Sequence, residues 1–178
     1  MNDYYTKRIS ILTALISFST GTALLIFYYT EMSILTILNS FYVVLSLIII
    51  NVFLLLFFLF KCFQNKISYG AFKKSGIILS ANVPVAILYL FYVNLLLSII
   101  RVTVVNHSGQ DITNIKVTGC ENKAIAFLEN DASKTVWIDI PQDCSVDIHF
   151  QRDGKNKNVN IIGYATSLMG QKVTYEIK

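Results

Sequence analysis

The sequence predicts a membrane protein of mixed class, in which three transmembrane helices (residues 1–100) precede a small antiparallel β-sandwich of about seven strands (residues 101–178). Hydrophobic residues make up 54% of the chain and charged residues only 15%, whereas a soluble domain carries about 25% charged residues. The segment 9–100 holds one acidic and four basic residues, but the segment 101–178 holds nine of each. These counts exclude a soluble single-domain enzyme, a disordered tail and a nucleic-acid-binding domain.

Three apolar stretches, at about 9–30, 34–60 and 76–100, are each long enough to cross a bilayer, which takes about 20 residues. None of them contains an ionisable side chain of Asp, Glu, Lys, Arg or His. The short turn at Thr30–Ser33 predicts that the first two spans form a helical hairpin. Because the first apolar run continues past its small-residue cluster at Ser19–Ala23, we expect an uncleaved span and not a signal peptide.

Basic residues predict the orientation of the spans. The N-terminal segment and the turn between the second and third spans carry all the bases of the membrane half, and the Thr30–Ser33 turn carries none. Loops rich in Lys and Arg remain in the cytoplasm, so we expect a bacterial inner-membrane protein whose N-terminus is cytoplasmic and whose C-terminal domain is periplasmic. The second turn also suits anionic lipid headgroups, at about 1 kcal/mol per base. Its bases are Lys61, Lys66, Lys73 and Lys74.

Small and polar residues recur on one face of each span. Small residues at steps of four let helices approach closely, and side-chain amides and hydroxyls can bond between helices. These residues either join the helices of one bundle, join protomers, or form a groove for a ligand or partner helix. Without charges in the spans, ion-coupled transport is not expected, although a channel lined by several protomers stays open. The predicted packing residues are Thr13, Ser17, Gly21, Asn39, Ser46 and Asn82.

After Arg101 the pattern becomes alternating, with turn residues such as Asp153-Gly154 between short runs, which is typical of strands and hairpins. Close spacing of about seven strands predicts an antiparallel sandwich. The strands are expected near 101–106, 112–117, 124–128, 134–140, 145–151, 158–162 and 172–177. The expected core is Trp137, Phe127, Ile140, Val146, Ile148, Phe150 and Ile161.

Two of the three cysteines, Cys120 and Cys144, fall in the segment expected outside the cytoplasm, where disulfides persist. We predict that they form a disulfide, which would close a loop of about 25 residues and add roughly 3–4 kcal/mol in the chain-entropy model. The alternative is two free buried thiols. Cys62, at the inner boundary of the membrane, is a simple boundary residue or a candidate for acylation.

Residues 104–117, VVNHSGQDITNIKV, resemble the first hairpin of bacterial immunoglobulin-like modules, which often begin with an N-x-S-G-x-x-I-x-N-V run. Those modules continue with a G-x-S-x-T-V turn and strand. Here DASKTV keeps Ser133, Thr135 and Val136 but has Asp131 in place of Gly, and Ile115 stands where the first run has Val. The resemblance covers about 35 of the 178 residues. It implies an immunoglobulin-like fold and no catalytic residues.

No pattern for a catalytic, cofactor or metal site is present. The two histidines, His107 and His149, are expected on the surface, and no cysteine or histidine pair has ligand spacing. The loop 163–170, GYATSLMG, combines large side chains with glycines. It either contacts a protein partner, closes one end of the sandwich, or rests on the bilayer. The side chains concerned are Tyr164, Leu168 and Met169.

The sequence therefore predicts a non-enzymatic integral membrane protein that presents a β-sandwich at the outer face of the inner membrane for protein–protein interaction. A specific version is an immunity protein against a membrane-acting toxin. The alternatives are an accessory subunit of a membrane transport or secretion complex and a small oligomeric pore. The expected partner is another membrane or extracytoplasmic protein, with homo-oligomerisation open; no nucleic acid and no cofactor are expected.

Overall fold

A computed structural model describes residues 3–32, 34–152 and 154–178 of the chain. Ser33 of the expected hairpin turn and Asp153 of the expected Asp-Gly turn lie outside the described residues. The chain divides into two compact units, Met1–Tyr92 and Val93–Lys178.

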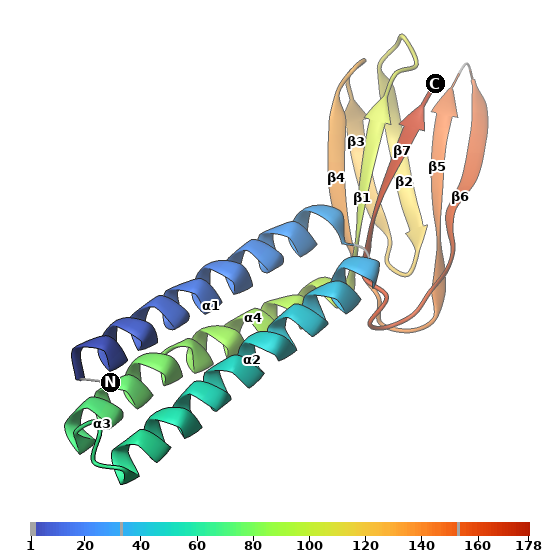
Figure 1. The fold of residues 1–178 in the computed structure, drawn as a ribbon. Helices are drawn as coiled ribbons and strands as arrows, with labels where there is room; N and C mark the ends of the chain where they lie inside the picture. Colours follow the sequence, from blue (N-terminus) through green and yellow to red (C-terminus); the bar gives the residue numbers. More distant parts are fainter. Residues whose placement is uncertain (1–2, 33, 153) are drawn as a thin grey trace. The chain divides into compact units, whose positions relative to one another are not determined.

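Long apolar helices make up the first unit (Figure 1). They are α1 (Asp3–Glu31), α2 (Ile34–Phe63), α3 (Tyr69–Ser80) and the start of α4 (Asn82–Leu97). Together, α3 and α4 make one apolar segment, Tyr69–Leu97, so that three helical segments are long and apolar enough to cross a membrane. The predicted membrane-type class is therefore supported in the described chain.

The third apolar segment is interrupted at Ala81, whose backbone N–H lies within hydrogen-bond distance of the carbonyls of Ile77 and Ile78. Pro84 follows in the first turn of α4, where the missing backbone donor costs least. Helix α3 therefore ends at Ser80 and α4 begins at Asn82, two residues before Pro84.

The helix ends earlier than the apolar run predicts. α4 stops at Leu97, and strand β1 begins at Ile99, so the expected span 76–100 extends too far. Ile100 is fully buried in the core of the β-domain, because a β-branched residue packs well in a strand. Only Ser98 separates helix from strand.

Seven strands follow in two sheets, as predicted. They are β1 (Ile99–Asn106), β2 (Ile112–Gly119), β3 (Lys123–Leu128), β4 (Ser133–Asp139), β5 (Cys144–Arg152), β6 (Lys155–Ala165) and β7 (Gln171–Ile177). One sheet has the order β4-β1-β7 and the other β3-β2-β5-β6. All pairs are antiparallel except β1 with β7, which is parallel.

A single apolar cluster draws side chains from both sheets. Of the expected core residues, Ile140, Val146, Ile148 and Phe150 are buried, and Ile161 packs against them partly buried. The expectation was wrong for two aromatic residues. Trp137 is 43% exposed and Phe127 is 47% exposed. Their strand neighbours Ile138 and Leu128 point inward, and adjacent residues in a strand face opposite sides.

Asn114 explains the imperfect alternation of β2. Its φ is 58°, in the left-handed region that Asn tolerates better than most residues. This local twist lets Ile112 and Ile115 both enter the core despite their spacing of three residues.

The segment that resembles immunoglobulin-like modules contains a buried asparagine, Asn106, which hydrogen-bonds to several backbone carbonyls. The Asn106 side chain is fully buried, and its amide nitrogen donates to the carbonyls of Gln110 (2.8 Å), Leu128 (3.1 Å) and Glu129 (3.1 Å). Asp131 has a φ of 58°, which accounts for Gly at that position of the pattern. The motif residues thus close the loop end of the domain and have a structural role.

Candidate interaction sites

The junction between α4 and β1 is held by two neighbouring loops. The backbone N–H of Gly170 donates to the carbonyl of Leu97 at 2.8 Å, and the N–H of Ile140 donates to the carbonyl of Ser98 at 3.0 Å. The side chain of Leu96 is only 1% exposed. These bonds satisfy carbonyls that a helix end leaves open, so the last turn of α4 is built into the β-domain.

Gly170 is the residue on which this junction depends. A methyl group in place of its hydrogen would lie 2.0 Å from the Leu96 carbonyl oxygen and 2.7 Å from the Leu97 Cα. Both are backbone atoms, which cannot move aside as a flexible side chain can. Any larger residue would therefore separate the loop from the helix.

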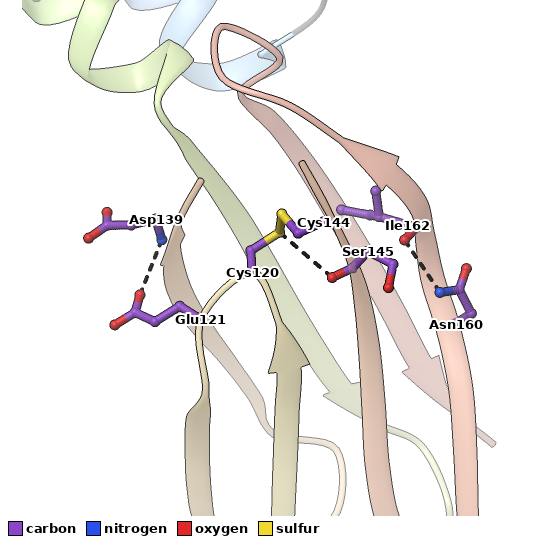
Figure 2. Close-up of a disulfide and its surroundings, with 7 residues drawn as sticks. All are labelled: Cys120, Glu121, Asp139, Cys144, Ser145, Asn160 and Ile162. Carbon is purple, nitrogen blue, oxygen red and sulfur yellow. Dashed lines mark hydrogen bonds between the residues drawn. A yellow bond between two sulfur atoms is a disulfide. The ribbon is translucent and has the colours of Figure 1, made fainter. Parts of the chain in front are cut away.

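A disulfide joins Cys120, just after β2, to Cys144, at the start of β5, as the sequence predicts (Figure 2). The two Cα atoms are 5.1 Å apart, a normal separation for such a bond. Beside it, Gly119 has a φ of +123°, and a methyl group there would lie 1.8 Å from the Ser145 carbonyl oxygen. The close backbone approach of β2 and β5 thus requires glycine next to the cross-link.

Glu121 ties the same end of β2 to another strand. Its carboxylate accepts a hydrogen bond from the backbone N–H of Asp139 at 3.1 Å (Figure 2) and pairs with Lys123. These contacts, the Lys123 bond first, hold the pKa of Glu121 below its usual range. The disulfide and this carboxylate together connect β2, β4 and β5 at the end of the domain where β1 begins.

The loop after β6 lies at that end as well, since its Gly170 binds Leu97. Tyr164 is 57% exposed and Leu168 is 62% exposed, and Met169 is half-buried. Leu168 has a φ of 69°, a conformation that is rare for a bulky residue. Two of the three predicted partner-contacting side chains are therefore open at the surface.

Tyr164 fixes the base of this loop. Its hydroxyl donates to a carboxylate oxygen of Asp143 at 3.0 Å. Hydrogen bonds from Thr166 and then Tyr164 lower the pKa of Asp143, and the carboxylate raises the pKa of Tyr164. The acid is thus held in its charged form as an acceptor within the loop.

The outer face of the sheet β3-β2-β5-β6 carries three polar rows, which we call the polar face. Cross-strand pairing aligns Lys116 with His149 and His149 with Asn158. A ring nitrogen of His149 also lies 2.9 Å from the Thr118 hydroxyl. His149 thus occupies the outer side of its strand, as expected, but its side chain is half-buried and not fully solvated. The members of the polar face are Asn114, Lys116, Thr118, Asp147, His149, Gln151, Asn156, Asn158 and Asn160.

A shallow hollow of about 420 Å³ lies on this face, lined mainly by amides, Lys116 and His149. Such groups donate and accept hydrogen bonds but include no nucleophile paired with a base. His107 pairs with Asp131 at 3.0 Å and is exposed. Among the described residues, no group of three His, Cys, Asp or Glu side chains could hold a metal.

In the helical unit, the predicted small-residue stripe of α1 contacts its own neighbouring helices. The amide of Asn51 donates to the Ser17 hydroxyl at 3.0 Å. A methyl group at Gly21 would lie 3.3 Å from the Tyr89 ring. The amide of Asn82 donates to the Ala14 carbonyl at 2.8 Å. Three of the six predicted packing residues thus join helices within one chain.

The other three are placed differently. Thr13 is half-buried, whereas Asn39 and Ser46 lie on an exposed face of α2, with Ser46 bonded to the Tyr42 carbonyl of its own helix. The sequence also missed Asn51 as a packing residue, although a single Asn within an apolar run was a usable signal. It likewise missed the bond between Thr22 and Tyr89, at 2.5 Å.

The basic turn meets the start of α1. Asp3 accepts hydrogen bonds from the backbone (3.0 Å) and hydroxyl (2.7 Å) of Ser68, the residue that caps α3. Beside this contact, an open hollow of about 720 Å³ is lined in part by Lys66 and the free thiol of Cys62. Lys61 lies over the Phe57 ring, 5.2 Å from its centre. Binding of anionic lipid by the four lysines remains a prediction.

Comparison with known proteins identifies no family for this chain. No family model matches the chain, and no curated protein matches it. One solved structure, described as the NMR structure of a protein from Eubacterium rectale, is similar over 46% of this chain and 80% of that chain. Its identity is 15% and its TM-score 0.36.

Proposed function

We propose that this protein is a non-enzymatic integral membrane protein that presents its β-domain at the outer face of the bacterial inner membrane to bind another membrane or extracytoplasmic protein. The observation that carries the proposal is the α4–β1 junction. A domain joined to an apolar helix by the single residue Ser98, with Gly170 bonded to Leu97 at the helix end and Ile140 bonded to Ser98, has no reach of its own. Its partner must come to the membrane.

The proposal includes a location for each part of the chain, with the β-domain in the periplasm and the N-terminus in the cytoplasm. The bond between Cys120 and Cys144 suits an oxidising environment, and the six bases on the opposite side of the spans suit the cytoplasm. Both arguments support a cytoplasmic N-terminus and a periplasmic β-domain.

We assign the partner contact to the polar face. Its amides, Lys116 and His149 can donate hydrogen bonds to the carbonyl and carboxylate oxygens of a partner protein. A hollow of about 420 Å³ on this face offers a partner a concave surface lined mainly by polar side chains. A small domain without catalytic groups suits an immunity protein that blocks a membrane-acting toxin, and it suits an accessory subunit of a transport or secretion complex equally.

The fold of the β-domain is proposed to be an immunoglobulin-like sandwich. Support comes from the shared core of the two sheets and from the pairing of β1 with β4 and of β2 with β5, which resembles the pairing of the central strands in such domains. The parallel strand β7 beside β1 is a departure from that pattern.

An oligomeric pore is the less favoured alternative, because Ser17, Gly21 and Asn82 make contacts within the chain. The exposed Asn39 and Ser46 are the residues that a homo-oligomer would use. Conductance of the purified protein in liposomes would favour the pore.

Affinity purification from membranes in mild detergent, followed by mass spectrometry, tests the proposal. We expect a membrane or periplasmic protein to copurify with the natural chain and to be lost from the double variant Lys116→Glu, His149→Ala. A matched control is Lys134→Glu, an exposed charge reversal on β4 in the other sheet. Recovery of no partner, or equal loss with the control, would refute the assignment.

A further inference from the structure

The C-terminal end of α4 lies close to the boundary between hydrocarbon and headgroups. Lys73 and Lys74 mark the other end of the span, since ammonium groups do not remain in the hydrocarbon core. From Lys74 to Leu97 the helical segment, interrupted at Ala81, rises at most roughly 35 Å, at about 1.5 Å per residue. The hydrocarbon core is about 30 Å thick. Leu97 is therefore within a few ångströms of the headgroup layer.

The loop after β6 is bonded to this point. The N–H of Gly170 donates to the Leu97 carbonyl at 2.8 Å, and Leu168 is two residues away. Two residues of chain span at most about 7 Å, and the headgroup layer of one leaflet is roughly 5–7 Å thick. Leu168 therefore lies within about 10 Å of the Leu97 carbonyl, close enough to enter the interfacial layer.

The side chains of the loop suit that layer. Leu168 is 62% exposed and Tyr164 is 57% exposed, and Tyr is enriched at membrane interfaces because its ring is apolar and its hydroxyl polar. Leu168 also holds a φ of 69°, which costs free energy in a bulky residue. The charged group next to them, Asp143, accepts a hydrogen bond from the hydroxyl of Tyr164.

We infer that the loop around Leu168 is a lipid-contacting anchor, in which Leu168 inserts at the boundary between headgroups and acyl chains and Tyr164 lies beside it. Lipid, and not a protein partner, then covers these side chains. The anchor requires only that the apolar segment Tyr69–Leu97 crosses a bilayer, and it is independent of the partner proposed for the polar face.

Quenching of tryptophan fluorescence by brominated lipid tests the anchor in the full-length chain. Trp137 is the only tryptophan, so Trp137→Phe gives a silent background. Leu168→Trp is added to it, and the protein is reconstituted into vesicles of phosphatidylcholine with bromines near the carbonyl end of the acyl chains. Ser108→Trp, in the loop at the opposite end of β1, is the control.

We expect a blue-shifted emission at position 168 that loses most of its intensity to the brominated lipid, and several-fold less quenching at position 108. Tyr164→Trp provides a second probe if Leu168→Trp does not retain the disulfide. Emission typical of water at both loop probes would overturn the anchor. A blue shift without quenching would overturn it too, since a protein would then cover the loop.

Discussion

The two units of this chain place their apolar side chains in opposite ways. In the β-domain, sixteen hydrophobic residues form one buried cluster. In the helical unit, most large apolar side chains are exposed, and only 6% of the most apolar window of each candidate span is buried within the described structure. Besides Phe58, the fully buried residues there include Thr6, Ser10 and Ser75, which are small and polar.

The difference is explained if water surrounds the β-domain and lipid surrounds the helices. Water drives the β-domain to bury its apolar groups, whereas lipid leaves no such force between helices and favours close packing and hydrogen bonds. The β-domain therefore depends on its core and cross-links, and the helical unit depends on many weak contacts such as that between Asn51 and Ser17.

Removal of the disulfide should have the largest effect. The double variant Cys120→Ser, Cys144→Ser should lose about 3–4 kcal/mol of unfolding free energy, as expected for a cross-link between residues 24 apart. Denaturation followed by Trp137 fluorescence, which reports on the β-domain, measures it. Cys62→Ser in the helical unit is the control and should leave the transition unchanged; alkylation of both outer thiols without reductant would show that the bond is absent.

A glycine-to-alanine pair compares the two units directly. Gly170→Ala should destabilise the β-domain by roughly 2–3 kcal/mol, since the methyl group meets backbone. Gly21→Ala should cost well under that, because the methyl group meets the Tyr89 side chain at 3.3 Å, which can shift. Gly163→Ala, with only an ordinary contact to Asn160, serves as control. Equal effects at positions 170 and 21 would contradict the contrast.

Loss of a single hydrogen bond between helices should matter less. Tyr89→Phe removes the bond to Thr22 and should cost about 0.6 kcal/mol, the mean for such bonds in membranes. Unfolding of the full chain in mixed micelles measures it. Tyr92→Phe, at an exposed position on α4, is the matched control, and a cost above about 2 kcal/mol would show a stronger dependence on polar bonds than we expect.

The smallest effect should be the pH dependence of the loop after β6. The pKa of Asp143 is lowered from its ordinary 3.8 in the folded chain, so its contribution is present above that pH and is lost as the pH falls through the folded pKa. Asp143→Asn should flatten the acid limb of the stability curve. Tyr164 has a raised pKa, so its contribution is full below pH 10.0 and lost as the pH rises through the folded value. An acid limb unchanged in Asp143→Asn would contradict this account.

Periodicity and composition predicted the strands closely, because water forces alternation on a sheet with one buried face. The errors arise where tertiary contacts override local pattern. Ile99 and Ile100 continue an apolar run in the sequence, but the burial of Ile100 makes them part of a strand. Trp137 and Phe127 were expected inside because they are large, yet Ile138 and Leu128 occupy the inward positions.

The candidate sites were less predictable. The polar face depends on the register of β2 against β5, which aligns Lys116 with His149, 33 positions away, and such a distant pairing leaves no local motif. The role of Gly170 depends on a backbone approach to Leu96 and Leu97, which no spacing reveals. The disulfide was predictable because only two of the three cysteines, Cys120 and Cys144, fall in the segment expected outside the cytoplasm.

The central claim is that the β-domain works outside the cytoplasm, fixed to its span. A membrane-impermeant maleimide applied to intact cells tests it most directly, with a single added thiol at Ser108→Cys in the Cys62→Ser background. Ser108 lies in the loop between β1 and β2. We predict labelling without lysis. Labelling that occurs only after the membrane is broken would place the domain in the cytoplasm and contradict the account.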